Sequence, residues 1–446
     1  MATINEINAQ ILSETTTATS LRNGIENNAI LNGVELNNDT PNSTLTKLNV
    51  SAVKNNKDLG NYKKIIERSE ENGGIYVVPS GITKLGKYSL YSNDNTRTID
   101  LSECNIESID DFAIGDCLDI IAPQNDVVEI SSLAFSPNIT ADSDKYFCNG
   151  KWVQLSPSST TSKSIDSGTE LIIGNDISDT YHQSITSLSL PNTLKGICKG
   201  GLSSYGISSF TAPATLKSLQ KSALSNCQSL AYIDLQYATN LLEIGEECFK
   251  DCNAILSVEF SPNIKTIRKK AFYNIASSVS SSSLNINIVN TIEKIEDYAF
   301  AGDGISYAGI KTLTISGNNT KLTEIPLYCF QYNTQLTTVD FGTNLALETI
   351  SGHAFMDCTS LTTISIPEGV KDVSWYAFYE CTNLTTVDLP STLKNIGSAC
   401  FSYTNLTTLN FAGTMAQWGE MTFGNSNWHD NSPLTTVHCS DGDITL

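Results

Sequence analysis

The sequence is poor in basic residues and in the residue types that most often carry out chemistry. It has 27 Lys and Arg against 47 Asp and Glu, a formal charge of -20 at pH 7. This balance opposes non-specific attraction to nucleic acid or to an anionic membrane surface. Only four histidines occur, and the HExxH, P-loop, GxGxxG and GxSxG motifs are absent. We therefore expect no enzyme activity, no metal site and no cofactor.

Long apolar runs and a secretory signal are missing as well. No apolar stretch has the length needed to cross a bilayer. The N-terminus, MATINEIN, lacks the basic segment followed by an apolar segment that marks a cleaved signal. We expect the chain to stay where it is made, or to leave by another route such as inside a virus particle.

What the sequence does contain is a repeat from about residue 82 to the C-terminus. Its clearest copies begin LTTISIP at Leu361 and LTTVDLP at Leu384. A small residue followed by a large apolar one marks each copy, usually 21 to 25 residues after the last, with two intervals of 28 and 30 and one gap of 67. The pairs are Ser89-Leu90, Ala113-Ile114, Ala134-Phe135, Gly201-Leu202, Ala223-Leu224, Cys248-Phe249, Ala271-Phe272, Ala299-Phe300, Cys329-Phe330, Ala354-Phe355, Ala377-Phe378 and Cys400-Phe401.

This spacing predicts a repeat solenoid of the leucine-rich type. LTTVDL has apolar residues at its first, fourth and sixth positions, as in a short strand with one buried face. A constant period stacks such strands in parallel, and each solenoid turn, here called a coil, covers the apolar side of its neighbour. We expect short irregular or helical return segments, and we expect the large residues of the pairs to stack on one another.

The cysteines follow the same repeat. Most of the 12 occupy the small position of a pair or the position three residues after its large residue. A disulfide or metal site is one reading, and Cys248 and Cys252 suit it best. The other reading is a set of buried free thiols acting as small apolar residues. Because Ala, Ser, Asn or Thr fill these positions elsewhere, we prefer the second reading.

The unit resembles the BspA-like, or Treponema-pallidum-type, leucine-rich repeat. The small-large pairs, the trailing Cys and the LTT strands at 361, 384 and 434 carry this resemblance, over roughly residues 80 to 446. The end of the chain, with GTMAQW at Gly413 and a further Trp428, is similar to the family's terminal segment. The resemblance implies a right-handed solenoid used for adhesion or recognition, without catalytic residues. Family members are mostly surface proteins of bacteria or protists, and similar arrays occur in phage genomes.

Outside the repeats the sequence changes character. Short amphipathic helices are predicted in a small N-terminal region, which resembles segments of phage virion-attached proteins, and it either attaches the chain or caps the first coil. A helix over 58–72 precedes a first strand at Ile75, and Tyr146 to Val153 reads as a hairpin. The predicted division is a helical N-terminal segment at 1–50, a helical linker at 51–78, a first repeat block at 79–155, a linker or degenerate coil at 156–184, a second repeat block at 185–412 and a C-terminal cap at 413–446.

The best candidate site is the outward face of the strands. In each LTT strand the residues between the buried positions are polar, and parallel stacking would align them in a strip. The residues proposed to bind a ligand are Thr338, Asp340, Thr363, Ser365, Thr386, Asp388, Thr408 and Asn410. The alternative is a solvated sheet face in which Thr serves β-propensity. Trp418 and Trp428 are expected in the core of the cap, whereas Trp375 falls in a turn where it could be exposed.

These observations favour a non-enzymatic binding protein. The first hypothesis is a virion-associated phage tail or fibre protein that recognises a host surface, with residues 1–50 contacting other virion proteins. The second is a bacterial cell-surface or secreted adhesin, and the third is a structural spacer. The expected partner is a host-surface protein or glycan, with no nucleic acid and no membrane insertion. The chain could also form a homo-oligomer.

Overall fold

The computed structural model describes most of the chain after residue 74. Its described residues are 75–78, 80–86, 98–109, 113, 119–121, 129–130, 144–148, 151–155, 161–165, 167–173, 182–277, 284–304, 309–315, 319, 321–342, 346–425 and 427–446. The predicted helical segments at 1–50 and 58–72 lie outside these residues. No helix within them is long and apolar enough to cross a membrane.

The chain divides into two compact units, one of residues 1–158, 166–177 and 197–201, the other of 159–165, 178–196 and 202–446. The first unit contains two parallel sheets, β1-β3-β5 and β2-β4-β6, and the predicted hairpin, whose strands β7 and β8 pair antiparallel. Its strands are β1 (Ile75–Val77), β2 (Lys84–Leu85), β3 (Thr98–Asp100), β4 (Ser108–Ile109), β5 (Asp119–Ile121), β6 (Glu129–Ile130), β7 (Asp144–Cys148), β8 (Lys151–Leu155) and β10 (Thr169–Ile173).

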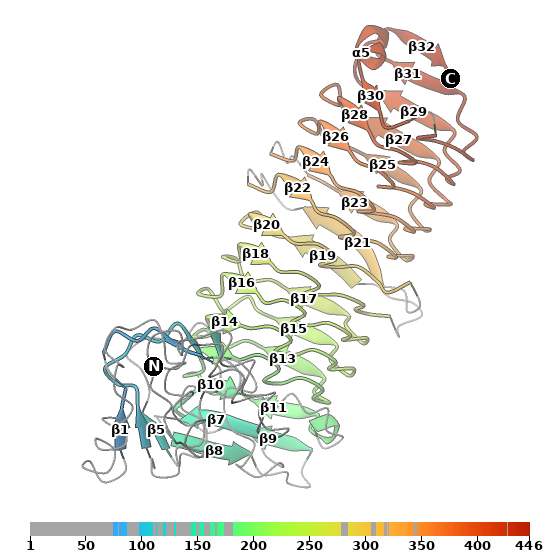
Figure 1. The fold of residues 1–446 in the computed structure, drawn as a ribbon. Coiled ribbons are helices and arrows are strands. Elements are labelled where there is room, and N and C mark those ends of the chain that lie inside the picture. Colours follow the sequence, from blue (N-terminus) through green and yellow to red (C-terminus); the bar gives the residue numbers. More distant parts are fainter. Residues whose placement is uncertain are drawn as a thin grey trace, which may run out of the picture. The chain divides into compact units, whose positions relative to one another are not determined.

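The second unit is the predicted parallel solenoid (Figure 1). Its longer strands are β9 (Ser162–Ser164), β11 (Ser187–Ser189), β13 (Ser209–Thr211), β15 (Tyr232–Asp234), β17 (Ser257–Glu259), β19 (Leu284–Ile288), β21 (Ile310–Ile315), β23 (Thr338–Asp340), β25 (Thr363–Ser365), β27 (Thr386–Leu389), β29 (Thr408–Phe411) and β31 (Thr436–Cys439). After most of them comes a two-residue strand: β12 (Gly196–Ile197), β14 (Ser218–Leu219), β16 (Glu243–Ile244), β18 (Thr266–Ile267), β20 (Lys294–Ile295), β22 (Glu324–Ile325), β24 (Thr349–Ile350), β26 (Asp372–Val373), β28 (Asn395–Ile396) and β30 (Thr422–Phe423).

The return segments are turns rather than helices. The described residues hold one α-helix, α5 (Met415–Gly419), and one 3-10 helix, η2 (His182–Ser184). Strands β9 and β10 lie inside the stretch 156–184 that the sequence predicted as a linker or degenerate coil, and β9 pairs in parallel with β11. The predicted boundaries of the blocks remain predictions.

The core is a column of stacked phenylalanine rings, as the sequence predicted. Centroids of successive rings lie 5.2 to 5.4 Å apart and their planes differ by 2 to 15°. The column runs through Phe249, Phe272, Phe300, Phe330, Phe355, Phe378 and Phe401, all fully buried. Offset ring pairs add attraction beyond the burial of apolar area. The column therefore ties each coil to the next.

The preferred reading of the cysteines is confirmed for those that the structure describes. They are free thiols, and all but Cys439 are buried. In addition, Cys381 donates from Sγ to the carbonyl of Phe355 at 3.2 Å, and Cys358 does the same to Phe330 at 3.4 Å. Asn333 fills the same position in its own coil and donates to the Phe300 carbonyl at 2.9 Å. In these coils the position holds a small hydrogen-bond donor, whereas Ile275 fills it in the coil of Phe272.

The turns around the core column have an unusual backbone. Residues two before and two after the core ring adopt positive φ in coil after coil, for example Tyr328 (58°), Tyr332 (62°), Tyr376 (57°) and Glu380 (57°). This left-handed region costs a non-glycine residue about 1–2 kcal/mol. Hydrogen bonds between coils offset that cost, such as Tyr376 N–H to the Ser398 carbonyl at 2.9 Å. Equivalent turn side chains are thus held in rows along the solenoid.

The C-terminal segment closes the second unit as a cap. Trp418 of α5 and Trp428 are both 5 % exposed, as expected for cap core. Trp428 meets the last core ring, Phe401, edge-on with centroids 6.3 Å apart. The helix begins with a capping box in which Thr414 accepts from Gln417 N–H and the Gln417 side chain accepts from Thr414 N–H. The final strand, β32 (Gly442–Thr445), pairs antiparallel with β31.

Candidate functional site

The predicted ligand-binding residues lie on the outer face of the longer strands, and together they are called the polar strip: Thr338, Asp340, Thr363, Ser365, Thr386, Asp388, Thr408 and Asn410. Each is exposed or half-buried. Between them on β27, Val387 and Leu389 are buried in the core. The alternation follows from the two-residue period of a strand, in which neighbouring side chains point to opposite faces.

Strand register aligns most of the polar strip in two rows. Thr363, Thr386 and Thr408 are successive partners across β25, β27 and β29, and so are Ser365, Asp388 and Asn410. The Asn410 amide donates to the Asp388 carboxylate at 2.7 Å. Thr338 and Asp340 lie on β23, which pairs with β21 in a separate three-stranded sheet. The strip is therefore a flat array of hydroxyl, amide and carboxylate groups suited to hydrogen bonding.

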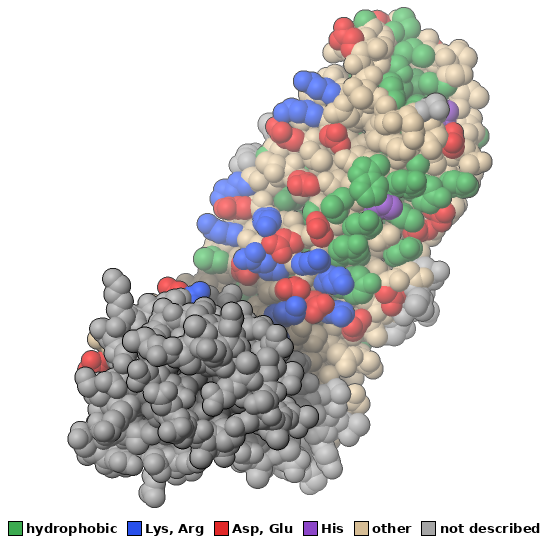
Figure 2. Space-filling view, viewed as in Figure 1, with side chains coloured by type: hydrophobic (Ala, Val, Ile, Leu, Met, Phe, Trp, Pro, Cys, Tyr) green, Lys and Arg blue, Asp and Glu red, His purple; other side chains and the backbone are tan. Residues whose placement is uncertain are grey.

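A second surface lies in the turns that follow the two-residue strands, and the sequence predicted only one part of it, the exposed turn at Trp375. It is called the aromatic strip and consists of Tyr298, Tyr328, His353, Trp375, Tyr376, Tyr379 and Tyr403. All are exposed or half-buried, with Trp375 at 44 % and Tyr403 at 48 %. In Figure 2 hydrophobic side chains gather over these coils, whereas Lys and Arg lie along the left edge of the view and across the coils nearer the N-terminus.

The rings of the aromatic strip touch from coil to coil. Tyr298, Tyr328, His353 and Tyr376 form one stack, with centroids 4.5, 4.7 and 5.0 Å apart in that order. Tyr376 also contacts Tyr379, with ring centroids 5.0 Å apart, and Tyr379 contacts Tyr403 of the next coil, with centroids 5.2 Å apart. Burial lowers the pKa of His353, which favours the neutral ring at neutral pH.

Two carboxyl groups lie in the turns of His353 and Tyr376. Asp357 and Glu380 occupy equivalent positions in adjacent coils. Burial, and then the charge and hydrogen bond of Glu380, raise the pKa of Asp357 to about 7. The pKa of Tyr379 is also raised, first by burial and then by the charge of Glu380. Among the described residues, neither carboxylate lies within ion-pair distance of a lysine or arginine.

The raised pKa gives a testable pH dependence. The ordinary pKa of an aspartate is 3.8, so between about pH 4 and pH 7 the folded state binds more protons at Asp357 than the unfolded state does. This contribution to stability is therefore lost as pH rises through that window. We expect Asp357→Asn to raise Tm relative to wild type more at about pH 8 than at about pH 5.

Thermal unfolding of both proteins across that pH range measures the effect, with Glu420→Gln as a control at an exposed carboxyl of the cap. A Tm difference between Asp357→Asn and wild type that does not change with pH would contradict the assignment.

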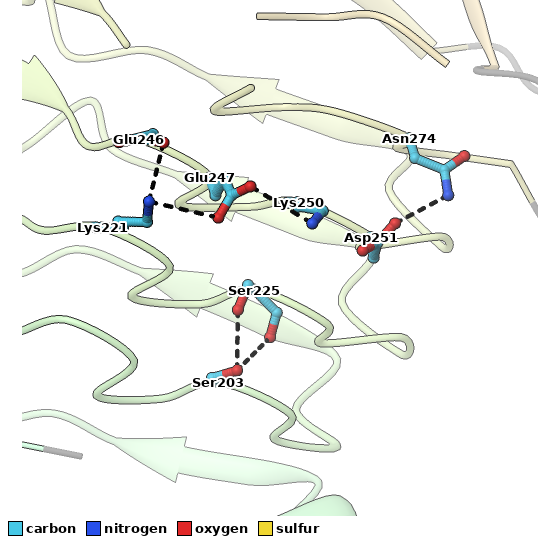
Figure 3. A network of polar contacts seen from close by, with 8 residues as sticks. All are labelled: Ser203, Lys221, Ser225, Glu246, Glu247, Lys250, Asp251 and Asn274. Atoms are coloured by element: carbon cyan, nitrogen blue, oxygen red, sulfur yellow. Dashed lines mark hydrogen bonds and ion pairs between the residues drawn. The ribbon is translucent and has the colours of Figure 1, made fainter. Parts of the chain in front are cut away.

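The coils nearer the N-terminus use the same turn positions differently. There Lys221 pairs with Glu246 at 2.9 Å and Lys250 with Glu247 at 3.5 Å. Asn274 donates to Asp251 at 2.9 Å (Figure 3). Acidic side chains in those turns thus have basic or amide partners supplied by the chain. The sequence signal that could have revealed the contrast is the residue two before each core ring, which changes from Glu247 and Lys270 to aromatic residues.

Solved structures of three bacterial proteins show low similarity to this chain. A leucine-rich repeat protein from Bacteroides ovatus is 17% identical, with a TM-score of 0.36, over 81% of this chain and 92% of that one. A leucine rich cell surface protein from Faecalibacterium prausnitzii is 16% identical, with a TM-score of 0.27, over 64% and 97%. The pneumococcal vaccine antigen PcpA is 13% identical, with a TM-score of 0.33, over 76% and 78%. No curated protein matches the sequence.

The repeats themselves match a family model, that of the BspA type leucine rich repeat region. It matches in six copies, at residues 75–144, 177–306 and 305–429. These ranges contain the coils with the phenylalanine column and the small donors beside it. The chain therefore belongs to the BspA type leucine rich repeat family.

Proposed function

We propose that this protein is a non-enzymatic recognition protein whose solenoid binds a host-surface protein or glycan through the polar strip. The observation that carries the proposal is the in-register array on β25, β27 and β29, where hydroxyl, amide and carboxylate groups face outward. A flat face with repeated donors and acceptors can match an extended partner at several points. Each hydrogen bond contributes modestly, so affinity would come from their number.

The test is binding of the full-length protein to intact bacterial cells and to isolated envelope glycans. We expect the double variant Thr386→Ala/Asp388→Ala to bind about tenfold more weakly than wild type, because it removes two adjacent polar contacts. The control variant Glu348→Ala/Lys371→Ala removes an exposed ion pair of 2.6 Å elsewhere on the solenoid. Equal binding by wild type and both variants would exclude the polar strip as the binding face.

The biological setting is a finer part of the proposal. In one form the protein is a virion component, a phage tail or fibre protein, and residues 1–50 attach it to other virion proteins. In the other form it is a bacterial surface or secreted adhesin. Immunogold labelling of producing cells and of purified particles separates them. Label on particles supports the first form, and label on the cell envelope supports the second.

A third form is a structural spacer without a receptor. It predicts that the full-length chain self-assembles but binds neither cells nor glycans. Light scattering of the purified protein, run beside the binding assay, distinguishes this form from the two recognition forms.

A further inference from the structure

The aromatic strip has no role in the proposal above, and it lies on a different segment of each coil from the polar strip. Its rings occupy turns rather than strands, and left-handed backbone positions present several of them outward. An exposed row of aromatic side chains is more often an interaction surface than an ordinary solvated face. The question is which partner chemistry it fits.

One end of the ring stack is already covered by a cation from the chain itself. The Lys270 ammonium lies 5.6 Å from the ring centroid of Tyr298, the first ring of the stack, and 5.1 Å from that of Tyr273. Both distances are within the range of cation–π attraction. At the other end, after Tyr376, the equivalent position of the next coil is Ala399, which has no ring and no charge.

Trp375 provides a flat platform at this second end. A Cβ added to Gly352 would lie 2.7 to 3.0 Å from three atoms of the indole, Cε2, Cδ2 and Cζ2, so one face of the ring packs on that glycine. Its plane is nearly perpendicular to His353 and Tyr376, at 89° and 88°. The side chain is 44 % exposed, so part of the ring is accessible to solvent.

Charge selects the kind of partner. The turns 326–332, 351–357, 374–380 and 397–403 contain two carboxyl groups, Asp357 and Glu380, which share a hydrogen bond, and no Lys or Arg. In the coils nearer the N-terminus, lysines of the chain pair with the glutamates of the turns. Exposed rings in turns whose only charged side chains are carboxyl groups are complementary to guanidinium or ammonium groups, which aromatic faces and carboxylates both attract. A neutral glycan could stack on the rings but would not compensate the negative charge of the Asp357–Glu380 pair.

We propose that the aromatic strip is a docking surface for a cationic protein segment, whose arginine or lysine side chains stack on Trp375 and Tyr376 and pair with Asp357 and Glu380. The partner's cation would lie against the ring at the Tyr376 end of the stack, as the Lys270 ammonium lies against Tyr298 at the opposite end. The site is independent of the polar strip, so Thr386→Ala/Asp388→Ala is expected to leave it intact.

The probe is a synthetic 12-residue peptide that alternates arginine with glycine and serine. Its matched control carries citrulline in place of arginine, which keeps the shape and removes the charge. Binding to the full-length protein is measured by isothermal titration calorimetry at low and moderate salt. We expect the arginine peptide to bind at least about tenfold more tightly than the citrulline peptide, and to weaken with salt.

Variants localise the binding. Trp375→Ala is expected to weaken it about five- to tenfold, and Asp357→Asn/Glu380→Gln to weaken it similarly while flattening the salt dependence. Tyr237→Ala is the control, since Tyr237 is 59 % exposed but lies outside the strip. Thermal unfolding of each variant checks that the solenoid remains folded.

Two outcomes would overturn the proposal. One is arginine-peptide binding that both strip variants leave unchanged, which would place the interaction elsewhere on the acidic chain. The other is an absence of arginine-peptide binding. In that case a neutral chitin hexasaccharide is tried as a ligand, and its binding can be abolished by Trp375→Ala. That result would make the strip a glycan surface.

Discussion

Phe355→Ala is expected to destabilise the solenoid by about 3–5 kcal/mol, the usual cost of truncating a buried phenylalanine. Phe355 is fully buried in the middle of the column, with ring centroids 5.3 Å from both Phe330 and Phe378. It also meets Phe341 edge-on at 6.3 Å. The substitution removes these contacts and leaves a cavity that neighbouring coils cannot close without breaking their own register.

Tryptophan fluorescence during urea unfolding measures this effect. Three of the four tryptophans, Trp375, Trp418 and Trp428, lie C-terminal to the substituted coil and report on that part of the array. Phe355→Leu keeps most of the volume and is expected to cost much less. Tyr232→Ala removes a side chain that is 55 % exposed and serves as the surface control. Equal midpoints for Phe355→Ala and Tyr232→Ala would contradict a column that holds the coils together.

The column was predictable because the repeat fixes it directly. A constant period with one large apolar residue per copy leaves few arrangements other than coils stacked with those residues in register. The polar strip could also be predicted from the sequence. Strand periodicity alone places Thr386 and Asp388 on the outer face once Val387 and Leu389 are buried. Whether the strip binds a ligand is a separate matter that strand periodicity does not address.

The aromatic strip could not be derived in the same way. Its orientation depends on left-handed backbone at positions such as Tyr328 and Tyr376, where φ is 58° and 57°. Propensity rules expect glycine or asparagine there rather than a bulky ring. The strained conformation persists because each turn is hydrogen-bonded to the next coil, as Tyr328 N–H is to the Gly352 carbonyl at 3.1 Å. Only the assembled array determines where these side chains point.

The stretch at 156–184 was difficult for a related reason. The polar run at its start, 156–165, is rich in Ser and Thr and indicated a linker. Yet β9 forms there and pairs with β11 through Ser162 to Ser187 and Ser164 to Ser189. An edge coil of a parallel array can gain its order from the backbone bonds offered by its neighbour, so few apolar residues are required. Amino-acid composition describes only the side chains, so it does not reveal stabilisation by backbone hydrogen bonds to a neighbouring strand.

Deleting residues 413–446 is expected to make the protein self-associate. The deletion removes the partner of β28, which is β30, and the partner of β29, which is β31. It also uncovers Phe401 and Phe411, which lie 6.3 Å from Trp428 and 5.4 Å from Trp418. Two open strand edges beside an apolar end are a template for pairing with another chain, and terminal caps keep repeat arrays soluble.

Size-exclusion chromatography with light scattering compares the truncated and full-length proteins at matched concentrations. Trp428→Ala in the full-length chain is the informative control, because it removes buried apolar area from the cap and leaves both strand edges paired. We expect that variant to lose about 3–5 kcal/mol of stability without added association. If it associates as strongly as the truncated chain, loss of apolar cover rather than open edges drives the assembly. If the truncated chain has the same association state and Tm as the full-length protein, the last coils are stable without residues 413–446, and that segment does not act as a cap.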